Sequence, residues 1–397
     1  MIKKFNAPRL RFPGFTDEWE QRKLSEVVTI NPKTELPDEF KYVDLESVVG
    51  TNLLGFQVIK KKNAPSRAQR LASYGDVFYQ TVRPYQRNNY LFENIDKDMV
   101  FSTGYAQLRS KLDSYFLLTL VQNDNFVKVV LDNCTGTSYP AINGSELGKI
   151  TVQIPSNDAE ANQIGKVFRG IDNIITLHQR KLNHLILKKK SLLQKLFPKN
   201  GGRYPELRFP GFTDAWEQRK FKDLFIERRE KTIRENEETL LSCAITGIYL
   251  NSELFSHFRG SSTIGYLKIK KYDLILSAQN LHLGNANINL SFEKGMISPA
   301  YKVFELKNID PYFINAWVKK DSTKNFFLKA TTEGASQCRK NIEWDVLLNQ
   351  EIPVPNNLEQ RVIGKFINNI DMIITLHQRK LNHLKLQKKA LLQQLFV

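Results

Sequence analysis

The sequence has few cysteines and no long hydrophobic run. Cys134, Cys243 and Cys338 are an odd number without a C-x-x-C pair, which excludes a disulfide framework and indicates free thiols in a reducing compartment. The longest apolar stretch, Tyr115–Val121, is far shorter than the roughly 20 residues that a bilayer crossing requires. Met1–Phe5 has two lysines but no apolar segment after them, so no signal or transit peptide is expected. We therefore expect a cytoplasmic protein with no membrane partner.

Acidic residues are also scarce relative to basic ones. The 397 residues include 58 Lys and Arg against 41 Asp and Glu, which gives a formal charge of +17 and a pI near 9.5. A surplus of this size indicates a polyanionic partner, and by itself it leaves DNA, RNA and a lipid surface open. At about 150 residues per domain, the length predicts two or three globular units.

The chain consists of two tandem halves with nearly identical flanking segments. PRLRFPGFTDEWEQRKL at 8–24 returns with three differences at 205–221, and IDNIITLHQRKLNHLILKKKSLLQKLF at 171–197 returns with five differences at 370–396. The middles, roughly 25–170 and 222–369, align only at isolated turns. Such a pattern indicates that the two flanking segments bind two identical partners, whereas the two middle segments recognise different targets. A recent duplication with accidental drift is the alternative, since a repeat alone does not fix function.

The middles are expected to fold as mixed α+β globules. Short β-rich runs such as 75–79 and 272–276 predict strands, and the segments 115–131 and 311–329 predict helices. The repeated Phe-Pro-Gly-Phe-Thr-Asp turn leads into a short helix or strand beyond Trp19 or Trp216.

Each half ends in a heptad-patterned helix. The seam positions from Ile164 to Leu196 are spaced alternately by four and three residues, and those from Ile363 to Leu395 repeat the pattern. The Pro198–Tyr204 connection is too short to run back along a rod of roughly 50 Å. We therefore expect an antiparallel two-helix coiled coil with pseudo-twofold symmetry and one globule at each end. The central seam residues are Ile171, Ile175, His178, Leu182, Leu185, Ile370, Ile374, His377, Leu381 and Leu384.

Two features of these helices leave alternatives open. Additional apolar residues beside the seam indicate that each helix also packs on a globule or that a further chain joins the pair. His178 and His377 occupy seam positions, where they either fix the register of the pair or extend their rings outward to solvent. The additional residues are Val167, Ile174, Leu177, Leu193 and Phe197.

The arrangement resembles a known family. Two variable domains between near-identical repeats, each ending in a helix with a Leu-His-Gln-Arg-Lys-Leu-Asn-His core, are similar to the specificity subunit of type I restriction-modification systems. Ile352-Pro-Val-Pro, Glu359-Gln360 and Ile363-Gly364 are similar to the start of the family's long helix, although the first half has Glu160-Ala161 in place of Glu-Gln. The segments 136–142 and 334–342 are similar to the family's final target-domain loop.

The resemblance implies a non-catalytic subunit that gives DNA sequence specificity to a larger complex. Each variable domain would read one half of a bipartite double-stranded DNA target, and the helices would set the spacer. The repeats would seat two modification subunits, which bring S-adenosylmethionine and adenine methylation. Restriction subunits would add translocation and cleavage that depend on ATP and Mg²⁺. The implied domains are a first target recognition domain at 1–157, a helix and linker at 158–204, a second recognition domain at 205–351 and a second helix at 352–397.

The residues themselves contain no complete catalytic motif. Asn31-Pro32-Lys33 lacks the second proline of an adenine methyltransferase motif, and 144–150 is one residue short of a P-loop and lacks its hydroxyl. The acidic residues in 37–41 are too close in sequence for a nuclease pattern. His178 and His184 are six residues apart, which rotates them by about 240° on a helix and excludes a shared zinc-binding face. We expect no cofactor and no metal in this chain.

The DNA-contacting residues are predicted from side-chain chemistry. Arg, Asn, Gln, Ser and Thr read base edges, whereas Lys and Arg hold phosphates. For any single residue, an ordinary polar surface loop is the alternative. In the first half the predicted residues are Lys60, Lys61, Lys62, Arg67, Arg70, Gln80, Thr81, Arg83, Tyr85, Arg87, Asn88, Asn89, Thr137 and Ser138. In the second half they are Ser277, Gln279, Asn280, His282, Asn285, Asn287, Gln337, Arg339 and Lys340.

A stand-alone bipartite DNA-binding regulator is the alternative function, although it would not need two near-identical protein-binding patches. The charge surplus is not all assigned to DNA either. Arg180, Lys181, Lys188–Lys190 and their second-half counterparts lie on the repeated helices, where they face either DNA or an acidic surface of a partner.

Overall fold

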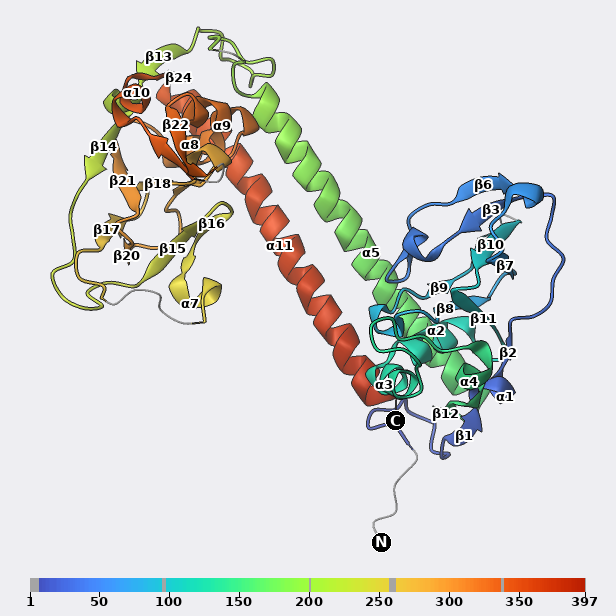
Figure 1. Ribbon diagram of the computed structural model, residues 1–397. Helices are drawn as coiled ribbons and strands as arrows, with labels where there is room; N and C mark the ends of the chain where they lie inside the picture. Colours follow the sequence, from blue (N-terminus) through green and yellow to red (C-terminus); the bar gives the residue numbers. More distant parts are fainter. Residues whose placement is uncertain (1–6, 95–97, 200, 257–261, 337–338, 397) are drawn as a thin grey trace. The chain divides into compact units, whose positions relative to one another are not determined.

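The chain divides into two compact units, each of which contains one end of both long helices. The computed structural model describes residues 7–94, 98–199, 201–256, 262–336 and 339–396 (Figure 1). Unit 1 comprises residues 1–179 and 379–397, and unit 2 comprises residues 180–378. Helix α5 (Asp158–Lys195) begins in unit 1 and ends in unit 2, whereas α11 (Asn357–Leu395) begins in unit 2 and ends in unit 1.

Unit 1 contains two four-stranded sheets and two two-stranded sheets, of which one is the pair of β4 and β5. The four-stranded sheets have the strand orders β2-β11-β8-β9 and β6-β3-β10-β7, and β1 pairs with β12. The strands are β1 (Glu20–Lys23), β2 (Val28–Ile30), β3 (Glu39–Val43), β4 (Val48–Val49), β5 (Asn52–Leu53), β6 (Gln57–Lys60), β7 (Ala68–Leu71), β8 (Val77–Gln80), β9 (Tyr90–Leu91), β10 (Met99–Ser102), β11 (Tyr105–Ser110) and β12 (Thr151–Ile154). The shorter helices are α1 (Leu24–Val27), α2 (Ser114–Gln122), α3 (Asp124–Asp132) and α4 (Gly144–Lys149), with 3-10 turns at Leu45–Ser47, Lys61–Asn63 and Pro84–Gln86.

Unit 2 contains one four-stranded sheet of order β14-β21-β18-β19 and several two-stranded pairs. Its strands are β13 (Glu217–Lys220), β14 (Phe225–Arg228), β15 (Leu241–Ala244), β16 (Gly247–Leu250), β17 (Leu267–Lys270), β18 (Leu274–Ser277), β19 (Ala286–Ile288), β20 (Lys294–Ile297), β21 (Tyr301–Leu306), β22 (Thr331–Ser336), β23 (Arg339–Ile342) and β24 (Glu351–Val354). Its shorter helices are α6 (Phe221–Leu224), α7 (Asn251–Leu254), α8 (Pro311–Val318), α9 (Asp321–Leu328) and α10 (Trp344–Asn349), with a 3-10 turn at Leu281–Leu283.

The two units share one four-stranded sheet and one two-stranded pair of the same topology, even where their sequences do not align. Sheet β2-β11-β8-β9 corresponds strand for strand to β14-β21-β18-β19, and the pair β1–β12 corresponds to β13–β24. The repeated Glu-Gln-Arg-Lys segment is the strand in both pairs, and its partner precedes the long helix that starts in the same unit. A loop at one position of unit 1 therefore has a topological counterpart in unit 2.

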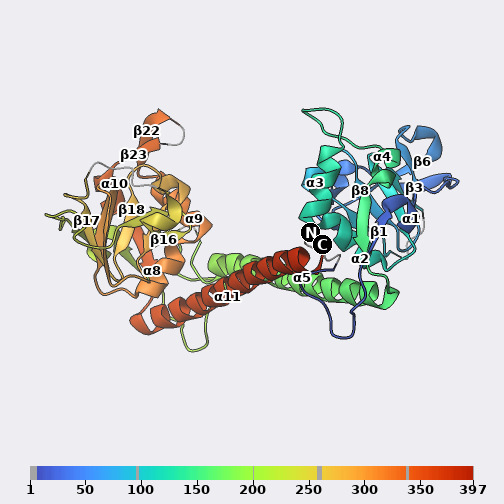
Figure 2. The same cartoon turned by 90° about the horizontal axis from the view of Figure 1, so that it is seen from below.

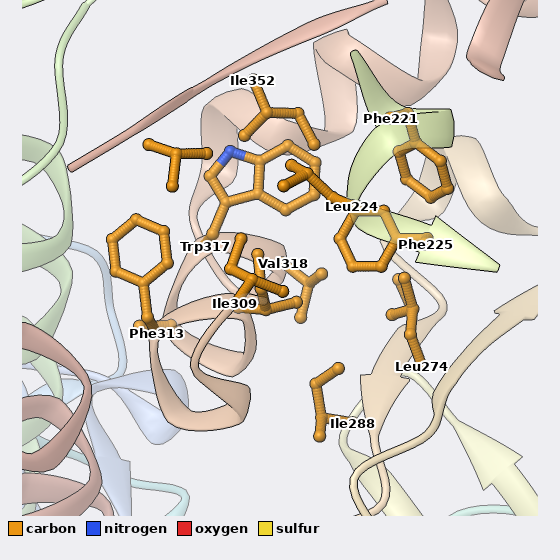
Figure 3. Packing of buried hydrophobic residues seen from close by; sticks show 14 of the residues in the cluster. Phe221, Leu224, Phe225, Leu274, Ile288, Ile309, Phe313, Trp317, Val318 and Ile352 are labelled. Carbon is orange, nitrogen blue, oxygen red and sulfur yellow. The ribbon is translucent and has the colours of Figure 1, made fainter. Parts of the chain in front are cut away.

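Each unit is built around a tryptophan from the repeated flanking block. In unit 1 the Trp19 ring lies edge-on to the rings of Phe116 and Phe396, with centroids 6.2 and 6.1 Å away. In unit 2 Trp216 packs in the same way on Phe197 and Phe313. Figure 3 shows the interior of unit 2, where residues of α6, α8, β18, β19 and β24 meet. The last turn of one long helix thus completes the core of the unit in which it ends.

Each long helix packs closely on the amino end of a shorter helix at an equivalent glycine, which is Gly165 in α5 and Gly364 in α11. Asp113 accepts a hydrogen bond from the Phe116 amide (2.8 Å) and caps α2, and Asp310 caps α8 in the same way through Phe313 (2.9 Å). A Cβ added at Gly165 would lie 3.0 Å from the Phe116 nitrogen and would overlap the Asp113 carboxylate. The absence of a side chain at Gly165 is therefore what lets α5 approach the amino end of α2.

The structure refines several predicted elements. The helical segment 115–131 is divided by Asn123, whose side chain caps α3, and 311–329 is divided between α8 and α9. The second long helix begins at Asn357, because Ile352-Pro-Val-Pro forms most of β24 instead. No helix in the described part of the chain carries an apolar stretch sufficient to cross a bilayer.

Candidate nucleic-acid interface

Two loops that were predicted separately form one surface in unit 1. We define the loop surface of unit 1 as residues 81–89, which follow β8, and 135–141, which precede α4. The Arg83 amide donates to the Pro140 carbonyl (2.8 Å), and Val82 pairs with Ala141 in an isolated antiparallel bridge. The Arg83 guanidinium lies over the Tyr139 ring, 4.4 Å from its centroid. The predicted base-reading residues of both loops are therefore neighbours.

Three of the predicted contact residues lie inside the loop surface rather than on it. Gln80, Thr81 and Asn89 are buried. The Asn89 side chain accepts from the Gln80 amide (2.8 Å), and the Thr81 hydroxyl donates to the Gly104 carbonyl (2.8 Å). In this structure these side chains hold the loop in shape, and their contact with DNA stays a prediction.

The exposed part of the loop is anchored by a second arginine. Arg87 donates to the Asp124 carboxylate (2.6 Å) and to the Gln122 carbonyl (2.9 Å), and this ion pair lowers the pKa of Asp124. Arg83 and Arg87 both have left-handed backbones, with φ of 53° and 55°. Such conformations are uncommon for residues other than glycine and often mark functional loops. Tyr85, Thr137 and Ser138 are exposed beside Arg83.

The predicted basic stripe belongs to the other sheet of unit 1. Lys60–Lys62 and Arg67 are exposed near the ends of β6 and β7, whereas Arg70 is half-buried and burial lowers its pKa. The Asn88 side chain links the loop 81–89 to the turn between β4 and β5 by accepting from the Gly50 amide (2.8 Å). The basic stripe and the loop surface therefore belong to one structural unit without direct contact between their arginines.

Unit 2 brings its two predicted loops together in the same topological place. The loop 278–285 follows β18, as 81–89 follows β8, and the Lys340 amide of β23 donates to the Gln279 carbonyl (3.4 Å). Figure 2 shows β22 and β23 at the end of unit 2 opposite α11. Gln337 lies outside the described residues, and the described part of Arg339 is its backbone.

Several predicted residues of unit 2 are also interior. Ser277, Asn285 and Asn287 are buried, and Asn287 donates to Cys243 Sγ (2.9 Å) and to the Ala244 carbonyl (2.8 Å). Ser277, Asn285 and Asn287 are thus interior in this structure, and their contact with DNA stays a prediction. His282 is half-buried, and neither ring nitrogen has a hydrogen-bond partner in the described chain.

A half-buried lysine that sequence reasoning missed contacts β19 and the turn after β15. Lys319 donates to the Ile245 carbonyl (2.8 Å) and bonds the Asn287 side chain. Burial lowers the pKa of Lys319 to about 8 and raises the pKa of Cys243 to about 11. The Lys319-Lys320 pair at the end of an otherwise apolar segment was the available signal, since a lysine there must either leave the core or find acceptors within it.

The long helices present a second candidate surface. Among the central seam positions, Leu182, Ile370, Leu381 and Leu384 are buried and the other six are half-buried. Large apolar residues beside the seam stay exposed, and we call them the outer stripe: Ile174 (46% exposed), Leu177 (66%) and Leu187 (67%) on α5, and Ile373 (43%), Leu376 (67%) and Leu386 (66%) on α11. Leu193 and Phe197 instead pack into unit 2, so the additional apolar residues have two separate roles.

Matching ion pairs tie the two long helices within each unit. In unit 1 Lys388 of α11 contacts Asp172 of α5 at 2.6 Å, and in unit 2 Lys189 of α5 contacts Asp371 of α11 at 2.5 Å. The two pairs occupy equivalent positions of the repeat, with the helix origins exchanged. The repeated sequence therefore makes the same helix–helix contact once in each unit.

Comparison with known proteins gives consistent matches. Residues 16–187 match the family described as the type I restriction modification DNA specificity domain. The type I restriction enzyme MjaVIII specificity subunit of Methanocaldococcus jannaschii is 23% identical over 320 residues, which cover 75% of this chain and 73% of that protein.

Solved structures share the fold. The type I restriction-modification S subunit from M. genitalium superposes with a TM-score of 0.64 at 13% identity, over 98% of this chain and 99% of that one. A chain from a structural study of assembly and conformational transition of the type I R-M system gives a TM-score of 0.52 at 19% identity, over 97% and 98% of the two chains.

Proposed function

We propose that the chain is a specificity subunit of a type I restriction-modification system and that its two units read the two halves of one bipartite double-stranded DNA target. The observation that carries this proposal is the pair of loop surfaces at one topological position. In unit 1 the surface contains Arg83 and Tyr85, whereas the loop 278–285 of unit 2 has no Lys or Arg. Equivalent loops with different chemistry suit two different half-sites.

The charge surplus supports duplex DNA as the polyanion. Lys60–Lys62 and Arg67 would contact phosphates beside the loop surface, which supplies affinity that falls as salt rises. Because the target is chromosomal DNA of a restriction system, the proposal also assigns the protein to the cytoplasm.

Exchange of one recognition segment is the direct test. Replacing residues 25–170 with the corresponding segment of another specificity subunit should change one half of the target and leave the other half and the spacer unchanged. Mapping methylated sites across the genome measures both halves at once. An exchange that altered both half-sites would contradict the assignment of one half-site to each unit.

The long helices would fix the distance between the two half-sites on the DNA. We expect them to pair as an antiparallel coiled coil with pseudo-twofold symmetry, and two observations support this: the low exposure of Leu182 and Leu381, and the equivalent ion pairs of Lys388 and Lys189. Inserting one heptad into each helix should lengthen the spacer and keep the half-site sequences. If the spacer stayed unchanged and the half-site sequences altered, the proposal that the helices set the spacer would be refuted.

The outer stripe would seat two modification subunits, one on each repeat. Exposed leucines at equivalent positions of two near-identical helices offer the same apolar contact twice, and large exposed apolar patches mark protein interfaces. Leu177→Glu or Leu376→Glu should each remove one modification subunit from the complex, and the double variant should remove both. Native mass spectrometry of the purified complex counts the copies.

A matched control comes from unit 1. Leu54 is 68% exposed but lies outside the helices, so Leu54→Glu adds the same charge without touching the outer stripe. It should leave two modification subunits bound. If Leu54→Glu reduced the count as much as Leu177→Glu, the effect would come from charge or misfolding and not from the proposed seat.

The chemistry would reside in the partners. S-adenosylmethionine, ATP and Mg²⁺ would bind the modification and restriction subunits, so the full chain alone should bind none of them in calorimetric titrations. The alternative, a stand-alone DNA-binding regulator, predicts that the lone chain binds its site at full strength without partners. A lone monomer with that property would count against the proposed complex.

A further inference from the structure

We propose that Arg83 reads a guanine in the half-site of unit 1 and that Tyr139 is the residue that positions it. This inference rests on the proposed function and assigns a specific base to one side chain. The Arg83 guanidinium lies 4.4 Å from the centroid of the Tyr139 ring, and Tyr139 itself is 62% exposed. The pair therefore lies on the open face of the loop surface.

The backbone of Arg83 is fixed from both sides. Its amide donates to the Pro140 carbonyl (2.8 Å), and its carbonyl accepts from the Gln86 amide (3.0 Å). Its left-handed φ of 53° is a conformation that must be held by its surroundings, because it is unfavourable for a residue with a Cβ. A fixed backbone together with a stacked side chain leaves the guanidinium little conformational freedom to lose on binding.

Arg83 differs from the other arginines of this region in its partners. Arg87 is bound to Asp124, and Arg109 is bound to Asp76 (2.8 Å). Within the described residues, the Arg83 guanidinium has no hydrogen-bond or ion-pair partner besides the Tyr139 ring. The contact with Tyr139 is a cation–π contact to the ring, so the N–H donors of the guanidinium remain available to a ligand.

The orientation favours guanine over a phosphate. Arginine binds the O6 and N7 atoms of guanine with two parallel hydrogen bonds in the major groove, which requires the guanidinium plane to match the plane of the base. A phosphate offers oxygens in several directions and gains less from a plane that is set in advance. The cation–π contact with Tyr139 restricts the movement of the guanidinium before DNA arrives.

The test begins with the target that the intact protein selects. The full chain in complex with its modification subunits is used to select duplexes from a random pool. Each guanine of the selected sequence is then replaced in turn by 7-deazaguanine, which lacks the N7 acceptor. At one position in the half-site of unit 1, we expect wild-type affinity to fall about 10- to 100-fold. The Arg83→Ala variant should bind guanine and 7-deazaguanine equally well at that position.

Conservative variants separate geometry from charge. Arg83→Lys keeps the positive charge but loses the planar pair of donors, so it should lose discrimination at this position. Tyr139→Phe keeps the stacking and should retain discrimination, whereas Tyr139→Leu should weaken it. Lys62→Ala is the phosphate-type control and should weaken binding evenly on all sequences. Recognition of the other half-site by unit 2 verifies that each variant is folded.

Each result bears on a defined claim. If the wild-type chain in complex with its modification subunits selects no sequence, the proposed function is refuted and this inference with it. If a bipartite sequence is selected but Arg83→Ala weakens binding equally on all sequences, Arg83 contacts phosphate and the inference alone is overturned. If Tyr139→Leu discriminates as well as Tyr139→Phe, the positioning role of Tyr139 is overturned.

Discussion

Replacing Gly165 with alanine should destabilise unit 1 through one identifiable contact. The new Cβ would overlap the Asp113 carboxylate and approach the Phe116 nitrogen to 3.0 Å. Because the Phe116 atom is backbone, the carboxylate is the group that must move, and it would abandon its role as the cap of α2. The substitution therefore removes a cap and overpacks a helix crossing at the same time.

The expected magnitude follows from these opposing effects. Loss of an N-cap costs about 1 kcal/mol, and overpacking a well-packed contact costs about 1–3 kcal/mol. Alanine is favoured over glycine within a helix by about 1 kcal/mol, which offsets part of the loss. The net destabilisation is about 1–3 kcal/mol, which corresponds to a fall in Tm of roughly 2–12 °C for a unit of this size.

Gly170 provides a matched control on the same helix. A Cβ at Gly170 would have no atom within 4 Å, so Gly170→Ala should stabilise unit 1 by about 1 kcal/mol. Scanning calorimetry measures the Tm, and hydrogen exchange of the peptide 113–122 reports whether the α2 cap opens. If Gly165→Ala raised the Tm as Gly170→Ala does, or left exchange of that peptide unchanged, the close-approach argument would be refuted.

Three further predictions concern ionised groups. Glu359 is fully buried and accepts two hydrogen bonds from Arg208, so Glu359→Gln should destabilise unit 2 by about 3 kcal/mol in chemical unfolding, and a loss below about 0.5 kcal/mol would show that the pair contributes little. Burial lowers the pKa of Lys320 from 10.5 to about 8, so the unfolded chain holds more protons between those pH values and the free energy of unfolding of unit 2 should rise with pH there. Lys320→Met should reduce that rise, and an unchanged pH dependence would contradict it. A double-mutant cycle on Lys388 and Asp172 should give a coupling energy of about 1 kcal/mol that shrinks at high salt, whereas additive effects would mean that the ion pair is not maintained in solution.

The elements with local sequence signals were predicted well. The heptad pattern from Ile164 to Leu196 predicted α5, because its apolar residues recur every three or four positions, which is about one helical turn. Strands β8 and β18 were expected because buried runs between turn residues are local too. The duplicated topology of the middles could not be read from their sequences, since sheet order depends on pairings between residues far apart in the chain.

The direction of polar side chains could not be predicted from the sequence. Asn287 and Asn89 lie in polar segments that look like surface loops, yet they are buried and bonded to groups elsewhere in the fold. For Asn287 those groups are Cys243 and Lys319, which are 44 and 32 residues away. No local pattern distinguishes such an asparagine from one that faces solvent, because its acceptors and donors are assembled only by the tertiary structure.

The location of Phe396 in the core of unit 1 has a consequence for biosynthesis. Unit 2 is one continuous segment, so it can fold as soon as residues 180–378 have left the ribosome. Unit 1 needs Leu395 and Phe396 beside Trp19 and Phe116, and these two residues are translated after all of unit 2. The half of the protein that is made first therefore finishes folding last, and until then its exposed core is the part of the nascent chain that most needs protection by chaperones.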